Sequence, residues 1–346
     1  MSDEILEPAK LERSTMNGKP VLWLEAKSII NFKSAFKEKE LCDGITFSTG
    51  TACAYSCSFC YVPSMFSRDP RITKMLDDAG LKFEDVTIRR REPLELVKRQ
   101  LHGLNGNPRY KADRRIVYTS PLVDVAANLD LVHETAKVAG YILANTGWTI
   151  RFLSKSNLLP VLARLLSSYR DRCIYGVSTG TLDDKLAKAF EEGTPLVSKR
   201  IESLRKLQDE GFRTFGMICP SLPFETGGCY RDFSKAITEA IRVDRCEHVW
   251  AEVMNVRGES FTRTIKALHD AGYSMEAFRL NDVSRSKELW EAYARETFDA
   301  HCKYVPPEKL KFLQYVDRYN FTYWKNRERL GAVLLGKLAH SQKQEA

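Results

Sequence analysis

The sequence predicts an α/β protein whose centre is a partial (β/α)6 barrel of the TIM type, with an N-terminal extension and a mainly helical C-terminal segment. Three observations predict this fold. Short apolar segments recur between residues 44 and 254, amphipathic helical patterns lie between them, and strand and helix alternate six times. Such alternation implies parallel strands that are joined by right-handed crossovers.

The expected strands are short, rich in β-branched and aromatic residues, and bounded by polar residues. They are residues 44–48, 115–119, 148–153, 173–178, 213–219 and 248–254. The helical segments between them carry apolar residues at three- and four-residue spacing, as an amphipathic helix requires. They are residues 129–144, 157–168, 182–191 with 196–210, and 230–243. In a barrel of this kind, reactive groups gather at the C-terminal ends of the strands.

The pattern divides the chain into three parts. These are an N-terminal extension (1–40), the barrel (41–257) and a helical C-terminal region that covers the open side of the barrel (258–346). The extension is polar apart from one apolar run, residues 20–24, which we expect as an edge strand or a cap. In the C-terminal region we expect helices at residues 286–301 and 308–329. The long segment 61–113 is expected to shape the substrate entrance.

Composition and charge limit the possible functions. The chain has 346 residues, a net charge of +8, 43% hydrophobic and 28% charged residues, which is typical of a globular protein. No apolar run approaches the roughly 18 to 20 residues of a membrane span, and residues 1–10 are acidic rather than signal-like. We therefore expect a cytoplasmic protein without membrane contact. Basic clusters at residues 89–91, 114–115 and 325–329 favour an anionic partner such as a nucleic acid, although solvated surface explains them as well.

Cysteine spacing is the strongest functional signal. Nine cysteines in a chain without an export signal argue against a disulfide framework. Cys53, Cys57 and Cys60 form a CxxxCxxC motif directly after the first expected strand. Thiolates are the usual ligands of iron–sulfur clusters, and three of them on one loop leave one iron of a [4Fe-4S] cluster without a protein ligand. S-Adenosylmethionine (SAM) can chelate that iron and be split there by one electron, which yields a 5′-deoxyadenosyl radical.

A zinc site is the alternative for these cysteines. Structural zinc takes four ligands, usually presented as two pairs, and the sequence has no second pair. Cys42 or His102 could serve as a fourth ligand. A zinc-stabilised nucleic-acid-binding protein without catalysis therefore stays open as a function of a different class.

The cysteine loop and the following Tyr61 resemble the radical SAM superfamily, and later segments resemble its spore photoproduct lyase and photolyase-like branch. The resemblance spans residues 44–255, and three segments carry its later part, residues 150–156, 175–185 and 192–223. The chain departs from the branch at residues 62–64 and 119–124. The resemblance implies a [4Fe-4S] cluster, SAM, an electron donor such as flavodoxin or ferredoxin, and a lyase-like or transferase reaction on DNA or another anionic substrate. A peptide or metabolite substrate would use the same cofactor residues.

Further site residues follow from this architecture and resemblance. Phe59 precedes the third cysteine, where the family form has an aromatic residue. Lys155 and Ser156 end the third strand and could meet the carboxylate or ribose of SAM, although surface placement explains them equally. Cys219, on the fifth strand, is a candidate hydrogen-atom donor, although free cysteine is commonly a small buried apolar residue. The remaining expected cofactor contacts, which core packing or capping also explains, are Ser120 and Ser178 as polar groups and Met217 and Ile218 as an adenine-binding edge.

Overall fold

All six apolar segments predicted as strands form strands of one large sheet. The computed structural model describes residues 15–119, 121–223, 230–256 and 258–339. Within them the sheet has nine strands in the order β13-β12-β11-β10-β9-β8-β7-β4-β3, and every pair is parallel except β3 with β4. The strands are β3 (Ile30–Asn31), β4 (Ile45–Phe47), β7 (Ile116–Thr119), β8 (Thr149–Ser154), β9 (Cys173–Thr179), β10 (Arg213–Ser221), β11 (Val249–Val253), β12 (Leu310–Tyr315) and β13 (Ala332–Leu335).

The C-terminal region differs from the prediction. Residues 308–329 were expected as a helix, and this expectation is wrong, because the segment contains strand β12 and only a short helix, α12 (Phe321–Lys325). In β12, Phe312 packs into the core under the helices while Leu313 packs into the opposite core, so the segment alternates with the period of a strand. With β13, this region extends the parallel sheet beyond the six predicted strands. No pairing that would close the sheet into a barrel is found in the described part of the chain.

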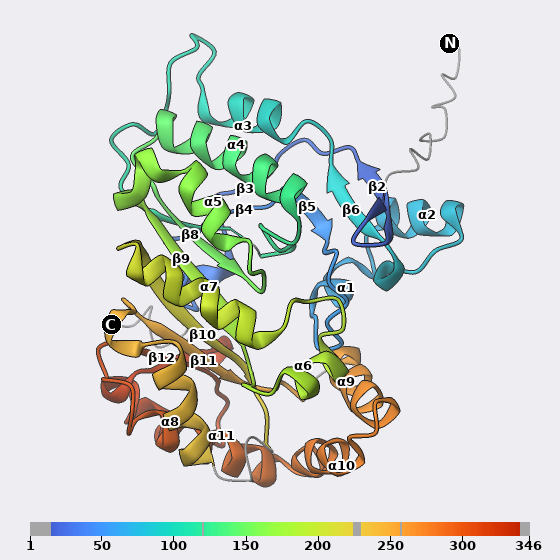
Figure 1. Cartoon of the computed structure of the whole chain (residues 1–346), viewed down its shortest axis with the longest axis vertical. Helices are drawn as coiled ribbons and strands as arrows, with labels where there is room; N and C mark the ends of the chain where they lie inside the picture. Colours follow the sequence, from blue (N-terminus) through green and yellow to red (C-terminus); the bar gives the residue numbers. More distant parts are fainter. Residues whose placement is uncertain (1–14, 120, 224–229, 257, 340–346) are drawn as a thin grey trace.

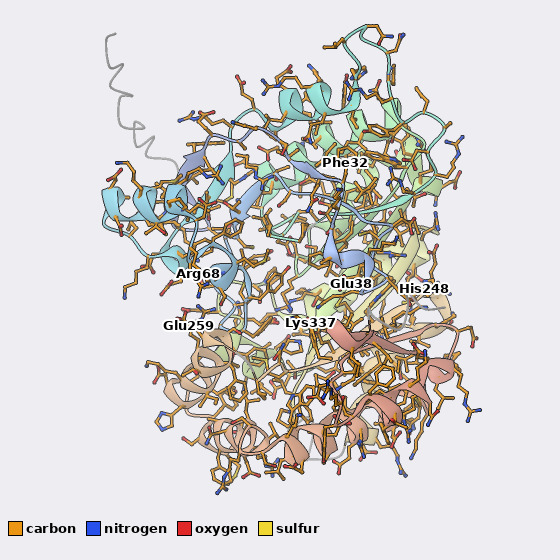
Figure 2. All side chains as sticks on the ribbon, turned by 180° about the vertical axis from the view of Figure 1, so that it is seen from behind. Phe32, Glu38, Arg68, His248, Glu259 and Lys337 are labelled. Atoms are coloured by element: carbon orange, nitrogen blue, oxygen red, sulfur yellow. The ribbon has the colours of Figure 1, made fainter. Side chains whose placement is uncertain are left out.

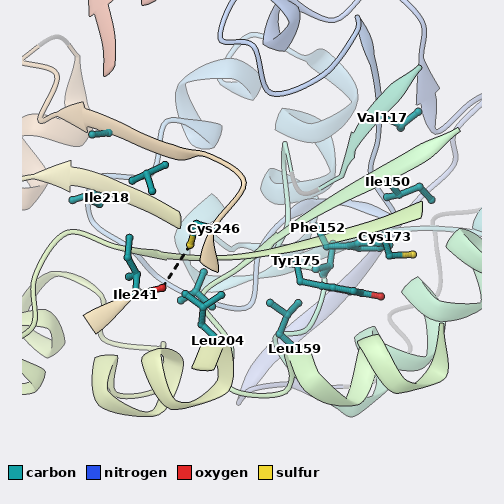
Figure 3. Close-up of a cluster of buried hydrophobic side chains, with 14 of the residues drawn as sticks. Val117, Ile150, Phe152, Leu159, Cys173, Tyr175, Leu204, Ile218, Ile241 and Cys246 are labelled. Carbon is teal, nitrogen blue, oxygen red and sulfur yellow. Dashed lines mark hydrogen bonds between the residues drawn. The ribbon is translucent and has the colours of Figure 1, made fainter. Parts of the chain in front are cut away.

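Helices cover the outer face of the sheet (Figure 1). They are α3 (Pro93–Leu101), α4 (Leu129–Asn145), α5 (Leu159–Leu165), α7 (Val197–Asp209), α8 (Tyr230–Ala240) and α11 (Lys287–His301), the last of which confirms the helix expected at 286–301. Figure 3 shows part of the core between these helices and the strands, where Phe152 stacks on Tyr175 with ring centroids 5.1 Å apart. In the same view Cys246 Sγ donates to the carbonyl oxygen of Ile241 at 3.6 Å. Each large apolar side chain buried there contributes about 1.5 to 3 kcal/mol.

The N-terminal segment closes the bottom of the inner face of the sheet. Asp43 exchanges hydrogen bonds with Ile116, the first residue of β7, so the segment lies at the N-terminal ends of the strands. Arg151 on β8 donates to the carbonyl oxygen of Leu41 at 2.5 Å and lies 4.6 Å from the ring centroid of Trp250 on β11. Residues 35–43, which we call the floor segment, therefore leave the C-terminal ends of the strands as the accessible end.

A second, four-stranded sheet stands beside the large one, in the order β1-β2-β6-β5. Its strands are β1 (Thr15–Met16), β2 (Lys19–Leu24), β5 (Gly50–Ala52) and β6 (Thr87–Arg90). The apolar run predicted at residues 20–24 is therefore a strand. One face of this sheet packs on α2 (Pro70–Ala79), and the other packs on the cysteine loop, where Val21 and Trp23 share a cluster with Cys53 and Cys57.

The small sheet and α2 lie on the same side of the molecule as α1 (Val62–Phe66) and α9 (Glu259–Asp270) (Figure 1). Seen from behind, Arg68, just after α1, and Glu259, at the start of α9, mark this side (Figure 2). Within the described ranges, no helix combines the length and apolar character that a bilayer crossing requires.

Candidate active site

The cysteine loop, residues 53–60, joins β5 to α1 beside the C-terminal ends of the large sheet's strands. All three motif cysteines are half-buried. Cys53 Sγ accepts hydrogen bonds from the backbone N–H groups of Tyr55 at 3.5 Å and Asp124 at 3.4 Å. Backbone donors of this kind suit a sulfur that carries negative charge. The motif follows β4 of the large sheet in the chain, as predicted, but β5 of the small sheet lies between the two.

Burial raises the pKa of all three thiols, and nearby charges modify the effect. The pKa of Cys53 rises to about 12 through burial and the negative charge of Asp124. For Cys57, burial and the carboxylate of Glu191 raise the pKa, and the ammonium of Lys155 opposes them. Cys53 and Cys60 also raise the pKa of Cys57, so the three thiols lie within electrostatic reach of one another. Because metal ligands bind as thiolates, a metal or cluster at this loop would have to displace the protons of these thiols.

Neither side chain considered as a fourth zinc ligand lies beside the cysteine loop. Within the described ranges, no group of three or more His, Cys, Asp or Glu side chains, the three motif cysteines included, is already arranged as a metal site. The two fourth ligands considered for zinc lie elsewhere. Cys42 packs with Phe215 and Trp250 against the inner face of the sheet, and the ring of His102 is hydrogen-bonded to the Lys98 carbonyl at the end of α3. Thiolates are ligands of both zinc and iron–sulfur clusters, and the loop itself presents three of them.

Two distant elements hold the cysteine loop in place. The backbone N–H of Ser58 donates to the carbonyl oxygen of Phe190, at the end of α6 (Asp184–Phe190), at 2.9 Å. The hydroxyl of Ser58 also donates to Thr264 Oγ1 on α9 at 3.0 Å. At Gly193, just after α6, an added Cβ would lie 3.3 Å from the backbone of the loop, so a side chain there would press against it.

Lys155 connects several predicted site residues. Its side chain leaves the end of β8, and its Nζ lies 5.1 Å from the ring centroid of Phe59 and donates to Ser178 Oγ at 3.2 Å. Its backbone N–H donates to the buried carboxylate of Asp124 at 2.7 Å. The structure therefore brings Phe59, Lys155 and Ser178 together beside the cysteine loop.

A buried carboxylate that the sequence did not single out pairs with Lys155. Glu191, whose side chain is 1% exposed, accepts from Lys155 Nζ at 2.7 Å and lies 2.5 Å from Arg200 Nη1. Burial alone would raise the pKa of Glu191, but the charges of Lys155 and Arg200 outweigh it and hold the pKa below its usual value. Arg200 is fully buried and also donates to the carbonyl oxygen of Pro195. No local pattern reveals this triad, because its members come from three different parts of the chain.

The other predicted residues are placed as follows. Ser156 is buried, and its hydroxyl accepts from the N–H of Leu158 at 3.0 Å, which makes it a turn cap. Met217 packs on the inner face of the sheet, whereas Ile218 packs on the helix-covered face. Successive strand residues point to opposite faces, so the two side chains do not form one edge. Ser120 lies outside the described residues. The cofactor roles assigned to these residues stay predictions.

Cys219 lies near the end of β10 with its thiol on the inner face, half-buried. Burial raises its pKa to about 12, and the negative charge of Glu252 adds to the effect while Lys39 opposes it. Glu252 on β11 pairs with Lys39 of the floor segment at 3.1 Å, and their side chains are 15% and 24% exposed. Tyr61, which donates to the carbonyl oxygen of Pro121, is 46% exposed at the rim. Solvent therefore reaches an ion pair beside the thiol.

Known proteins resemble this chain mainly in fold. No protein-family profile matches the sequence. The uncharacterized protein ORF301 of Acidianus two-tailed virus is 25% identical over 185 residues, which cover 54% of this chain and 58% of that protein. A spore photoproduct lyase complexed with dinucleoside spore photoproduct has a TM-score of 0.56 at 10% identity and covers 83% of this chain and 80% of its own. A cysteine-to-serine mutant of spore photoproduct lyase gives 0.55 at 12% identity with the same coverage. The chain thus shares the fold of spore photoproduct lyase.

Proposed function

We propose that this chain is a radical SAM enzyme in which Cys53, Cys57 and Cys60 hold a [4Fe-4S] cluster. The observation that carries the proposal is a loop with three thiols within electrostatic reach of one another, beside the C-terminal ends of parallel strands and a buried polar network. The shared fold with spore photoproduct lyase supports it. When bound, the reduced cluster would supply the electron that cleaves SAM to a 5′-deoxyadenosyl radical.

The chain's own residues would bind and orient SAM. The ammonium of Lys155 is available as a donor to the SAM carboxylate, and the hydroxyl of Ser178 to the ribose. Phe59 and Lys155 together would form one wall, and the apolar side chain of Met217 would exclude water from the inner face. Ser120 and Ser156 remain in the proposed contact set, whereas the side chain of Ile218 packs on the helix-covered face, away from Met217. Because Glu191 and Arg200 share the buried network, Lys155 is held in one position rather than left mobile.

The first experiment measures cluster loading and SAM cleavage. The anaerobically reconstituted wild-type protein should be brown, carry about four iron and four sulfide per chain, and release 5′-deoxyadenosine with dithionite. Cys57→Ala should abolish colour and product. Cys302→Ala is the matched control, because Cys302 ends α11 and is half-buried far along the chain from the motif. A colourless wild type with one zinc per chain, or a Cys57→Ala variant with full product, would contradict the proposal.

For the substrate we propose a nucleic acid, DNA in the first place, in a lyase-like reaction with Cys219 as hydrogen-atom donor. One solved structure with this fold is complexed with dinucleoside spore photoproduct, which supports a nucleotide-sized ligand. The half-buried thiol of Cys219 beside the Lys39–Glu252 pair supports the donor role. A cytoplasmic location with flavodoxin or ferredoxin as reductant belongs to the same proposal, because reduced thiols and cluster chemistry need a reducing compartment.

Substrate trials with Cys219→Ala test this part separately. With ultraviolet-irradiated DNA, the wild type should consume the lesion. Cys219→Ala should still release 5′-deoxyadenosine but give altered products, because the substrate radical no longer receives its hydrogen atom from the thiol. Cys246→Ala is the control, since Cys246 is buried under the helices. If only a peptide or metabolite is converted, or if Cys219→Ala turns over DNA normally, the nucleic-acid assignment or the donor role is wrong.

A further inference from the structure

Arg263 binds the cysteine loop directly from the C-terminal region. Its Nε donates to the carbonyl oxygen of Ser58 at 3.2 Å, and its Nη2 donates to that of Cys60 at 2.8 Å. The two carbonyl groups flank Phe59, so one planar guanidinium holds both ends of the segment 58–60 of the cysteine loop. Such a two-point contact uses the rigid fork geometry of arginine, which a lysine cannot reproduce.

The position of Arg263 is set by the buried face of α9. Phe261, Thr264 and Leu268 are the buried residues of this helix, at three- and four-residue spacing, and they pack toward the loop and α6. Arg263 lies next to this stripe and is half-buried. The helix therefore carries the guanidinium to the loop as a rigid unit.

Within the described residues, no acid neutralises the charge of Arg263. Among residues 15–119, 121–223, 230–256 and 258–339, no carboxylate lies within ion-pair distance of its guanidinium, whereas Lys266 on the same helix pairs with Asp270 at 2.5 Å. The positive charge also lies against the loop, since the guanidinium is hydrogen-bonded to the backbone carbonyl oxygen of Cys60 itself. A half-buried charge is screened less by solvent than an exposed one.

We propose that Arg263 is a positioning residue that fixes the cysteine loop and makes the bound cluster easier to reduce. The inference rests on the proposed [4Fe-4S] cluster. Cluster potentials depend on net charge, hydrogen bonding and exposure. Reduction adds one electron to a group that already bears three thiolates, so an unneutralised cation nearby favours the reduced state. In this way the C-terminal region would take part in the chemistry as well as cover the sheet.

Three variants separate charge from contact. Arg263→Met removes both, Arg263→Lys keeps the charge with fewer hydrogen bonds, and Thr264→Val removes an uncharged contact to Ser58, which retains its bonds to Phe190. Lys266→Met is the control for loss of a positive charge from the same helix, at an exposed site. Each reconstituted protein is titrated with dithionite, and the reduced cluster is quantified by EPR.

The equilibrium for reduction should become three- to tenfold less favourable in Arg263→Met, which is about 30 to 60 mV for one electron. Arg263→Lys should have a potential close to that of the wild type, and Thr264→Val and Lys266→Met should titrate like the wild type. An unshifted Arg263→Met, or an Arg263→Lys that shifts as far as Arg263→Met, would overturn the charge effect.

Hydrogen exchange of the apoprotein tests positioning without the cluster. Amides of residues 54–60 should exchange faster in Arg263→Met than in Lys266→Met. Equal exchange would overturn the positioning role of Arg263. The two proposals fail in different ways. A wild type that binds no iron overturns the cluster and this inference together, whereas a wild type that cleaves SAM while Arg263→Met keeps its potential overturns the inference alone.

Discussion

Replacing Glu191 by glutamine tests the buried triad beside the cysteine loop. The carboxylate of Glu191 is the shared partner of Lys155 and Arg200, at 2.7 Å and 2.5 Å, and both Glu191 and Arg200 are almost completely buried. The amide keeps the shape of the side chain but removes its charge, so two cations would face each other without a counter-ion.

The expected cost follows from this geometry. Removal of one partner from a buried ion pair costs about 3 to 5 kcal/mol. We expect about 3 kcal/mol for Glu191→Gln, because Arg200 keeps the carbonyl oxygens of Pro195 and Ser178 as acceptors. The control is Glu192→Gln, one residue along the chain and exposed, which should change stability by less than about 0.5 kcal/mol.

Urea unfolding of the apoprotein, followed by tryptophan fluorescence, measures both values. The pH dependence gives an independent check. Since the pKa of Glu191 lies below its usual value in the folded protein, its contribution is present above the unfolded-state pKa of 4.5 and is lost as pH falls toward the lower folded value. The wild type should therefore lose more stability below about pH 5 than Glu191→Gln does. A glutamine variant within 1 kcal/mol of the wild type at pH 7, or with an unchanged acid profile, would refute the triad as a stabilising unit.

Three further outcomes follow from the structure. Burial lowers the pKa of His301 from 6.5 to about 4, so the unfolded chain binds the proton at a higher pH than the folded chain. The free energy of unfolding should therefore fall by about 3 kcal/mol between pH 7 and pH 4. Urea titrations of a His301→Gln variant should lack this pH dependence. Gly180→Ala would place a Cβ 1.9 Å from a backbone oxygen of β10, so thermal scans should show a loss of about 3 kcal/mol, and a neutral result would mean that the loop can move. Lys39→Met leaves Glu252 without its cation and should lower the free energy of unfolding in urea by about 1 to 3 kcal/mol. The double variant Lys39→Met with Glu252→Gln should regain part of this loss, and an unchanged single variant would show that the pair is fully solvated.

The six predicted strands of the large sheet could be recognised because each is a short apolar run that is mostly buried on both faces. Residues 173–178, for example, read as a strand without any knowledge of their neighbours, and β9 is buried along its whole length. β6 was not predictable, since Thr87–Arg90 contains two arginines. Arg89 is nevertheless buried, because Glu134 on α4, far along the chain, pairs with it. Residues 308–329 read as helical because short apolar and aromatic runs fit both periods.

Of the site residues, too, some could be predicted from the sequence and others could not. Local spacing revealed Cys53, Cys57 and Cys60, and strand ends indicated Lys155. Asp124, Glu191, Arg200 and Arg263 act through partners that only the folded chain brings near, so no local pattern marks them. Ile218 shows the opposite failure, since a strand end was recognised but the face on which the side chain lies was not.

The floor segment has a consequence for how the chain acquires its structure. Lys39 is synthesised more than two hundred residues before its partners, since its carbonyl oxygen accepts from Trp250 Nε1 and its ammonium pairs with Glu252. Contacts of such sequence separation form slowly, because the intervening chain must be ordered first. The inner face of the first strands therefore stays incompletely covered until β11 has left the ribosome. A nascent chain stalled before that point would expose Arg151 and the aromatic side chains of the inner face to other proteins.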